Sequence, residues 1–263
     1  RGPSPRTVLT YPEICCHSLR DLQILDSREK TPYIVDGKTK RIYKETIIPY
    51  WKGKSIRDTI FNRMSDGWRV AYEAGVFTEF LEQRAPGHTV LDDKIYNKGL
   101  LSFIEEINKR MENLDILNDP EAPKKMEELR AMKIAADALI LYAKRHADKA
   151  RQLLKGEKDA ERREELKNIA DVCTRVPAQA PRNFWEALQH YWFMHIGVIT
   201  ELNPWDAFNP GRLDQHLYPF YKKGLEDGTL TEERARELLQ LFWIKFNNQP
   251  APPKVGVTAE ESN

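Results

Sequence analysis

The chain has 263 residues, of which 41% are apolar and 31% charged, a composition typical of a globular protein that can build a core. Its 41 basic and 40 acidic side chains leave a formal net charge of +1, so no overall field favours nucleic acid or an anionic membrane. No apolar run approaches the roughly 20 residues that span a bilayer, and the first residues contain no signal-peptide core. We expect a cytoplasmic protein, for which small neutral or zwitterionic ligands remain open.

The three cysteines are Cys15, Cys16 and Cys173. An odd number with two adjacent cannot make a disulfide framework, which fits a reducing compartment. The chain begins at Arg1 without an initiator Met. A strand is expected at residues 254–258, and the sequence stops at Asn263, shortly after it. We therefore expect a fragment of a longer protein.

The sequence of the amino-terminal quarter indicates little regular structure. Pro, Thr and Arg are frequent up to about Asp36, where we expect an ordered surface or pocket-lining loop, and short extended segments are expected at residues 7–11 and 47–50. The capping-box pattern of residues 55–58 then predicts the start of a helix. Its inward side chains would be Ile56, Ile60, Phe61 and Met64.

Helical spacing of apolar residues dominates the middle of the chain, between about residues 94 and 111 and again between 123 and 154. The second stripe consists of Leu129, Met132, Ala136, Leu139, Ala143, Ala147 and Ala150. A break at residues 156–159 precedes a third stripe, formed by Leu166, Ile169, Ala170 and Cys173. We therefore expect Cys173 to serve in packing.

Two later helices, at residues 184–199 and 232–247, are apolar on nearly all sides, which is typical of helices buried within a large protein. A chain of this length could scarcely cover them, so we expect further protein around both. We find no internal repeat and no linker that would divide domains. The whole chain is expected to be mostly α-helical and to form part of one domain.

The sequence offers no metal motif of the usual spacing. Cys15, Cys16 and His17 are adjacent and lack a second Cys/His pair. His190 and His195 lie five residues apart, roughly 140° around a helix, so they cannot share a metal ion, and we expect one or both to be core histidines with satisfied nitrogens. Phosphate loops, nucleophile elbows and basic-aromatic alternation are also missing from the sequence.

Two polar segments bordered by apolar helices, residues 77–88 and 200–212, are the candidates for a pocket. One interpretation is turn chemistry, with the acids capping helices or pairing with Arg212. The other is functional, because a histidine and a carboxylate in a dry pocket could exchange protons with a substrate hydroxyl or bind an amine. The residues alone leave both open.

Several motifs carry a resemblance to a known family: Tyr-Pro-Glu-Ile-Cys-Cys-His at 11–17, Ala-Pro-Gly-His at 85–88, Trp-Asp-Ala-Phe-Asn-Pro-Gly-Arg at 205–212 and Asn-Asn-Gln-Pro at 247–250. On these the chain resembles, from end to end, the glycyl radical enzymes of the pyruvate formate-lyase superfamily. Ala-Pro-Gly-His together with Trp-Asp-Ala-Phe is similar to the trans-4-hydroxy-L-proline dehydratases among them.

The resemblance implies the mostly α-helical amino-terminal part of a ten-stranded α/β barrel, in a homodimeric protein of anaerobic metabolism. It also implies a glycyl radical, installed by an iron–sulfur activating enzyme that uses S-adenosylmethionine, and a thiyl cysteine that takes hydrogen from the substrate carbon next to nitrogen. Loss of the neighbouring hydroxyl as water would then give 1-pyrroline-5-carboxylate. No metal or small-molecule cofactor is expected in this chain itself.

Carried over residue by residue, the resemblance assigns four side chains. Phe80 would pack against the substrate ring, His88 and Asp206 would join the hydrogen bonds around its polar groups, and Ser262 would help bind its carboxylate. The thiyl-cysteine loop and the glycyl radical domain are absent from these residues, so this chain alone is expected to be inactive. The open alternatives are another glycyl radical lyase (arylacetate decarboxylase, diol or glycerol dehydratase, or choline lyase) and a non-catalytic truncated homologue.

Overall fold

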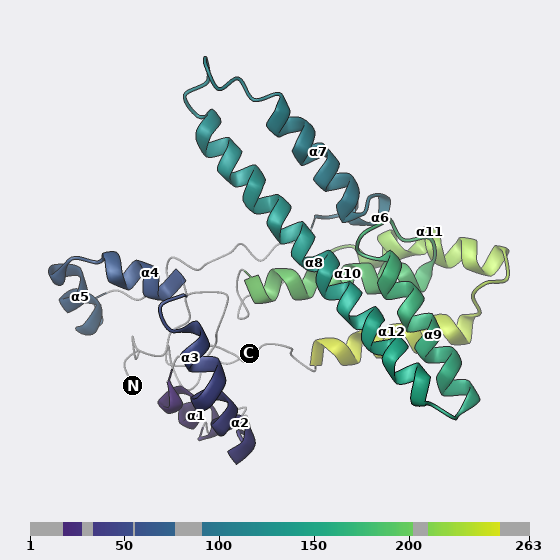
Figure 1. Ribbon diagram of the computed structural model, residues 1–263. Helices are drawn as coiled ribbons and strands as arrows, with labels where there is room; N and C mark the ends of the chain where they lie inside the picture. The colour runs from purple at the N-terminus through teal and green to yellow at the C-terminus, as the bar shows by residue number, and fades with distance from the viewer. Residues whose placement is uncertain (1–17, 28–33, 55, 77–90, 202–209, 248–263) are drawn as a thin grey trace. The chain divides into compact units, whose positions relative to one another are not determined.

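The computed structural model describes residues 18–27, 34–54, 56–76, 91–201 and 210–247 (Figure 1). Every regular element within these ranges is helical, which confirms the expected mostly α-helical chain. The elements are α1 (Leu19–Asp26), α2 (Gly37–Ile42), the π-helical turn η2 (Tyr43–Ile47), α3 (Ile48–Trp51), α4 (Ile56–Arg63), α5 (Asp66–Glu73), α6 (Lys94–Asn97), α7 (Leu100–Glu112), α8 (Ala122–Gly156), α9 (Ala160–Arg175), α10 (Phe184–Glu201), α11 (Leu213–Glu226) and α12 (Glu232–Asn247).

The chain divides into two compact units. Unit 1 comprises residues 1–88, 196–209 and 249–263, and unit 2 comprises residues 89–195 and 210–248. The helices α1 to α5 lie in unit 1, whereas α6 to α9, most of α10, α11 and α12 lie in unit 2. In the part of the chain that the structure describes, no helix is both long and apolar enough to cross a bilayer.

The core of unit 2 forms where α8 meets its neighbours α7 and α9, which run beside it in Figure 1. The predicted α8 stripe is buried at its alanines, because small side chains let the helices approach closely. Ala143 and Ala147 pack with Cys173 of α9 and Phe193 of α10, so the predicted packing role of Cys173 is confirmed. Met132, nearer the start of α8, is 55% exposed, and the prediction that it faces a core is wrong.

The start of α7 is fixed by the loop that follows α9. The backbone N–H groups of Leu100 and Leu101 donate to the carbonyls of Pro177 and Ala178, at 2.8 and 3.0 Å, and so satisfy two donors that a helix start leaves unpaired. A Cβ atom on Gly99 would lie 2.3 Å from the Ala178 carbonyl oxygen. Only glycine fits there.

The two apolar helices differ in how they are covered. The described residues bury α10 on nearly all sides from Phe184 to His195, so the expectation that this chain could not cover it is wrong. On α12 the predicted inner side chain Phe242 is 5% exposed, but Leu241, Trp243 and Ile244 are about half exposed. Only for α12 does an apolar face lie open.

The amino-terminal quarter is more helical than predicted. Residues 47–50 belong to η2 and α3 and are not extended; Pro49 stands at the start of α3, where its missing N–H is tolerated. The expected loop up to Asp36 contains α1, which buries Leu22. The predicted helix α4 is confirmed. The Asp58 carboxylate accepts a hydrogen bond from the Gly53 N–H, at 2.6 Å.

Other expectations fall on parts of the chain that the structure does not describe. These are the extended segment at residues 7–11, the strand at residues 254–258, Cys15, Cys16 and His17, and Ser55 of the capping box.

Candidate active site

All four side chains assigned by resemblance lie outside the described residues. Phe80 and His88 belong to residues 77–90, Asp206 to residues 202–209, and Ser262 to residues 248–263. Their roles therefore stay predictions. The structure does describe the residues on both sides of the first two of these segments, and it places several of them in contact.

The chain enters residues 77–90 from the end of α5. The N–H of Gly75 donates to the Tyr72 carbonyl at 3.0 Å, and the N–H of Val76 donates to the Ala71 carbonyl at 2.9 Å. With Gly75 at φ +75°, these bonds form a Schellman motif, which satisfies the last carbonyls of the helix. The helix that precedes the candidate segment thus ends at a defined residue.

The chain leaves residues 77–90 through two left-handed residues. Leu91 has φ +56° and Asp92 has φ +51°. This conformation costs a residue other than glycine roughly 1–2 kcal/mol; Asp tolerates it better than Leu does. Such backbone persists only where its surroundings hold it. The turn leads directly into α6.

The segment 202–209 is flanked by the buried helix α10 and by α11. Gly211, at φ +62°, turns the chain, and the Arg212 carbonyl then accepts the N–H groups of Gln215 and His216 at 2.9 and 3.0 Å. The Arg212 guanidinium lies 3.6 Å from the Asp214 carboxylate, with both side chains mostly exposed. This pair contributes little to stability because water screens it.

His216 of α11 brings the far sides of the two candidate segments together. Its ring stacks on Tyr96 of α6, with centroids 5.1 Å apart and planes inclined by 18°. Its Nε2 atom lies 3.4 Å from Asp92 Oδ1, a distance at which a protonated ring forms an ion pair, but the two atoms lack the geometry of a hydrogen bond. The Nε2 atom and the Tyr96 hydroxyl are thus both buried without a hydrogen-bond partner among the described residues. Burial also raises the pKa of Tyr96, so its phenol stays protonated.

The sequence contains a signal for this contact outside the family motifs. Leu213, Leu217 and Phe220 form the inner face of α11, and His216 falls on the same face. A histidine on an otherwise apolar helix face is expected to lie near a polar side chain from another part of the chain. The partner, Asp92, could not be found from periodicity because it lies in a turn far away in sequence.

His190 and His195 sit in the core of unit 2, as predicted. Burial lowers the pKa of each to about 4, so both rings are neutral at pH 7. His195 Nδ1 lies 3.3 Å from the Tyr191 hydroxyl. The Nδ1 atom of His190 has no hydrogen-bond partner among the described residues, so of these two rings only His195 has an observed partner for its Nδ1 atom. The described residues contain no cluster of three or more His, Cys, Asp or Glu side chains that could hold a metal ion.

Cys173 is not an activated nucleophile. Its side chain is buried among apolar neighbours, and this burial raises the pKa of the thiol to about 11. The thiol therefore stays protonated at pH 7, in keeping with a packing role.

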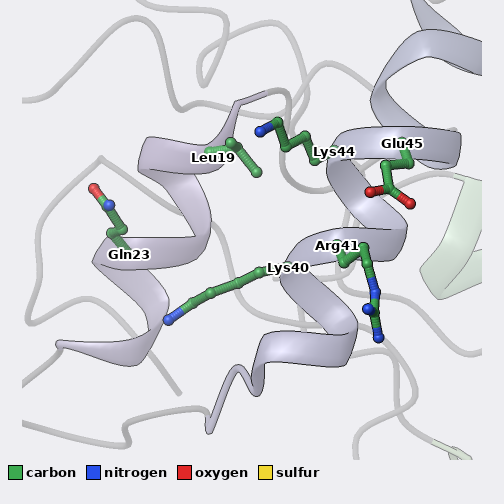
Figure 2. Close-up of a pocket in the computed structure, with 6 residues that line it drawn as sticks. All are labelled: Leu19, Gln23, Lys40, Arg41, Lys44 and Glu45. Atoms are coloured by element: carbon green, nitrogen blue, oxygen red, sulfur yellow. The ribbon is translucent and has the colours of Figure 1, made fainter.

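Unit 1 contains an open groove between α1 and the stretch α2–η2 (Figure 2), with a volume of about 320 Å³. It is lined by Leu19, Gln23, Lys40, Arg41, Lys44 and Glu45. Figure 2 shows Lys40 and Lys44 extending towards α1. The Lys40 ammonium is held by the Asp26 carboxylate at 2.9 Å, which also accepts the Val35 N–H at 3.1 Å. The contacts around the groove therefore connect α1 to α2 within unit 1. None of the predicted site residues lines it.

Comparison with known proteins first identifies the protein family of this chain. The whole chain, residues 1–263, matches the family described as Pyruvate formate lyase-like, and the chain belongs to that family. It is 34% identical over 256 residues to isethionate sulfite-lyase of Oleidesulfovibrio alaskensis, a match that covers 93% of this chain and 31% of the relative. The predicted superfamily is confirmed.

The similarity to one particular relative is higher. The chain is 52% identical over all 263 residues to trans-4-hydroxy-L-proline dehydratase of Clostridioides difficile, which covers 100% of this chain and 33% of that protein. The crystal structure of hydroxyproline dehydratase from the same organism, with trans-4-hydroxy-L-proline bound, matches with a TM-score of 0.79 and 53% identity. That match covers 96% of this chain and 32% of the other. The chain spans about a third of the length of these relatives.

A third match is a structure on 1,2-propanediol dehydration in Roseburia inulinivorans, with a TM-score of 0.74 and 31% identity. It covers 97% of this chain and 31% of the other. The fold of this chain is therefore a helical part of the pyruvate formate-lyase-type fold, as predicted.

Proposed function

We propose that the protein containing this chain is a glycyl radical dehydratase that eliminates water from trans-4-hydroxy-L-proline to give 1-pyrroline-5-carboxylate. One observation carries the proposal. Identity to the hydroxyproline dehydratase is 52% along the entire chain, against 34% to the isethionate sulfite-lyase. The match includes the segments with Phe80, His88, Asp206 and Ser262, which are the parts of the chain expected to touch a substrate.

The proposed roles follow from what the reaction demands. Hydroxide is a poor leaving group, so the departing hydroxyl needs a proton, and a positioned side chain that supplies it accelerates the reaction. His88 and Asp206 are the proposed donors and acceptors around this hydroxyl and the ring nitrogen. Phe80 would pack against the pyrroline-forming ring, and Ser262 would donate a hydrogen bond to the substrate carboxylate.

The described residues next to the segments that carry His88 and Asp206 are well defined. The segment with Asp206 follows α10, whose buried side chains hold the helix in place, and the segment with His88 lies between the capped end of α5 and the left-handed turn before α6. Catalytic groups act only when their supports hold them in productive positions.

The remaining parts of the proposal lie beyond this chain. A glycyl radical on a residue outside this chain would make the thiyl radical on a cysteine that is also outside residues 1–263, and that cysteine would take the hydrogen atom from the substrate. We propose a separate S-adenosylmethionine-dependent activating enzyme as a partner, a homodimer as the assembly, and an anaerobic cytoplasm as the location. These residues are then one portion of a pyruvate formate-lyase-type domain.

The experiment that tests this function uses the full-length protein, activated without oxygen by its activating enzyme. Incubation with trans-4-hydroxy-L-proline should yield pyrroline carboxylate, detected by mass spectrometry. A protein that carries the radical yet leaves hydroxyproline unchanged would contradict the proposal.

Replacing Asp206 tests the proposed site. Asp206→Asn keeps the shape of the side chain but removes its ability to exchange a proton, so kcat should fall by about a hundredfold or more. Asp214→Asn, on the exposed surface of α11, is the matched control and should keep the parent kcat. Full activity of the Asp206 variant would remove this residue from the mechanism.

A second candidate is a diol dehydratase. The observation that favours it is the TM-score of 0.74 to the structure on 1,2-propanediol dehydration. A diol lacks the amine and carboxylate of hydroxyproline, so turnover of 1,2-propanediol without turnover of hydroxyproline would select this alternative.

A further inference from the structure

A row of exposed side chains runs along α8. Its members are spaced alternately four and three residues apart, which places them on one face of the helix. Ile134 is 69% exposed and Leu141 is 49% exposed, so the described residues leave the centre of the row uncovered. We call it the outer row; it consists of Glu127, Ala131, Ile134, Ala138, Leu141 and Arg145.

The covered side of α8 lies opposite to the outer row. Ala136, Ala143 and Ala147 are buried on that side, and the last two pack on Cys173 and Phe193. At about 100° per residue, the outer row is centred about 180° around the helix from these alanines. Figure 1 shows α7 beside the first part of α8 and α9 beside the last part. The described part of unit 2 thus covers one of two apolar sides of α8.

The order of side chains in the outer row matches the same order read backwards. In two antiparallel α8 helices related by a two-fold axis, residue i faces residue j whenever j faces i. An axis level with Ala136 sets Ile134 opposite Ala138 of the second copy. It also sets Ala131 opposite Leu141. Each large side chain then meets a small one, as close packing requires. A contact with an unrelated surface would not need this match.

The two ends of the outer row carry opposite charges. The same two-fold arrangement sets Glu127 opposite Arg145 at both ends of the contact, whereas a parallel pair would set like charges together. Arg145 forms no ion pair with any described residue. Glu127 accepts a hydrogen bond from Arg130 at 2.8 Å, but this pair is exposed and therefore weak. Glu127 can thus also attract the second copy's Arg145.

Charges beside the outer row are already balanced within α8. Lys133 pairs with Asp137 at 3.1 Å, and Lys144 pairs with Asp148 at 2.6 Å. Both pairs lie one turn apart on the helix surface, where opposite charges offset each other. A second copy would therefore meet a flank without excess charge, and repulsion does not oppose the contact.

We propose that the outer row of α8 is a contact between two copies of this protein, in which the two α8 helices pack antiparallel about a two-fold axis level with Ala136. The inference rests on the homodimer of the proposed function and not on the proposed reaction. From Glu127 to Arg145 the contact is about 27 Å long, at 1.5 Å per residue.

Cross-linking of the full-length protein tests the contact without turnover. Ala138→Cys places two thiols about 6 Å apart along the helix direction, one on each side of the axis. A short bis-maleimide should link the two copies through residue 138, as identified by peptide mass spectrometry. Leu153→Cys is the control on the same helix; its thiols would lie about 50 Å apart and should not be linked. A link in both variants, or in neither, would overturn the proposal.

An acidic substitution in the outer row should weaken the dimer. Leu141→Glu should speed subunit exchange between two labelled batches of full-length protein at least about tenfold, because its carboxylate would lose water in the contact. Leu153→Glu is the matched control, since Leu153 is 48% and Leu141 49% exposed; it should change the rate less than about twofold. Circular dichroism should show both variants folded. Equal exchange rates, or a monomeric parent protein, would overturn the contact.

Charge reversal tests the antiparallel order. Glu127→Arg and Arg145→Glu should each speed subunit exchange about three- to tenfold, because each sets like charges opposite one another. The two changes together should return the rate to within about twofold of the parent. A double variant that exchanges faster than either single variant would overturn the arrangement. A dimer linked through residue 138 that leaves hydroxyproline unchanged would contradict the proposed reaction and support the contact.

Discussion

The helices α10 and α12 are alike in sequence, since both are apolar on nearly all sides, but they differ in how far the described residues bury them. Every side chain of α10 from Tyr191 to His195 is buried, whereas α12 buries Phe242 and leaves Leu241 and Ile244 half exposed. An apolar surface predicts that a helix will be covered. The apolar surface does not show which residues cover the helix, because these come from other parts of the chain.

The largest effect should come from the centre of the α10 contact. Phe193 is 2% exposed and packs on Ala143, Ala147 and Cys173. Phe193→Ala leaves a cavity among small side chains that cannot move to fill it, so the free energy of unfolding should fall by about 3–5 kcal/mol. Urea unfolding at pH 7 measures this, and a loss under about 1 kcal/mol would mean that α10 is not packed as described.

The next effect is a loss of stability in acid. The pKa values of His190 and His195 lie near 4 in the folded chain, against an ordinary value of 6.5. Below pH 6.5 the unfolded chain binds protons that the folded chain does not, so the stability that is complete above this pH is lost as the pH falls towards 4. Between pH 7 and pH 5 the loss should be about 2 kcal/mol for each histidine.

Urea unfolding at the two pH values checks this, with His190→Gln as the comparison. The variant should lose about 2 kcal/mol less than the parent between pH 7 and pH 5. Parallel losses in both proteins would show that His190 is not a buried neutral ring.

The smallest effect should come from the open face of α12. Leu241 is 51% exposed, so Leu241→Ala should change the free energy of unfolding of the 263-residue chain by no more than about 0.5 kcal/mol. Leu188→Ala, at a leucine of α10 that is 4% exposed, is the matched control and should cost at least about 2 kcal/mol. Equal costs would erase the difference between the two helices.

Much of the helical fold could be predicted from the sequence, because the α8 alanines and the α9 side chains Leu166, Ala170 and Cys173 repeat at helical spacing. The errors have local causes. Residues 47–50 contain two β-branched residues and a proline and were expected to be extended, but the preceding turn continues into them as helix. Met132 fits the apolar spacing of α8, but its side chain is 55% exposed, because spacing does not show which turns of a helix are covered.

The candidate site rests on a different kind of prediction, which the described residues do not test. Family motifs gave Phe80, His88, Asp206 and Ser262, all outside the described residues, whereas composition and periodicity only marked two polar segments as alternatives to simple turns. The contact of His216 with Asp92 was missed. A left-handed turn at Leu91 and Asp92 has no glycine to announce it, and the pair joins residues more than a hundred positions apart.

The central claim is tested most directly by one comparison of substrates. The full-length activated protein is offered trans-4-hydroxy-L-proline, 1,2-propanediol and glycerol in separate reactions, and kcat/KM is measured for each. A site that binds the amine and carboxylate should favour hydroxyproline by at least about a thousandfold, because buried polar groups left unpaired by a diol discriminate strongly. A higher kcat/KM for either alcohol would contradict the claim.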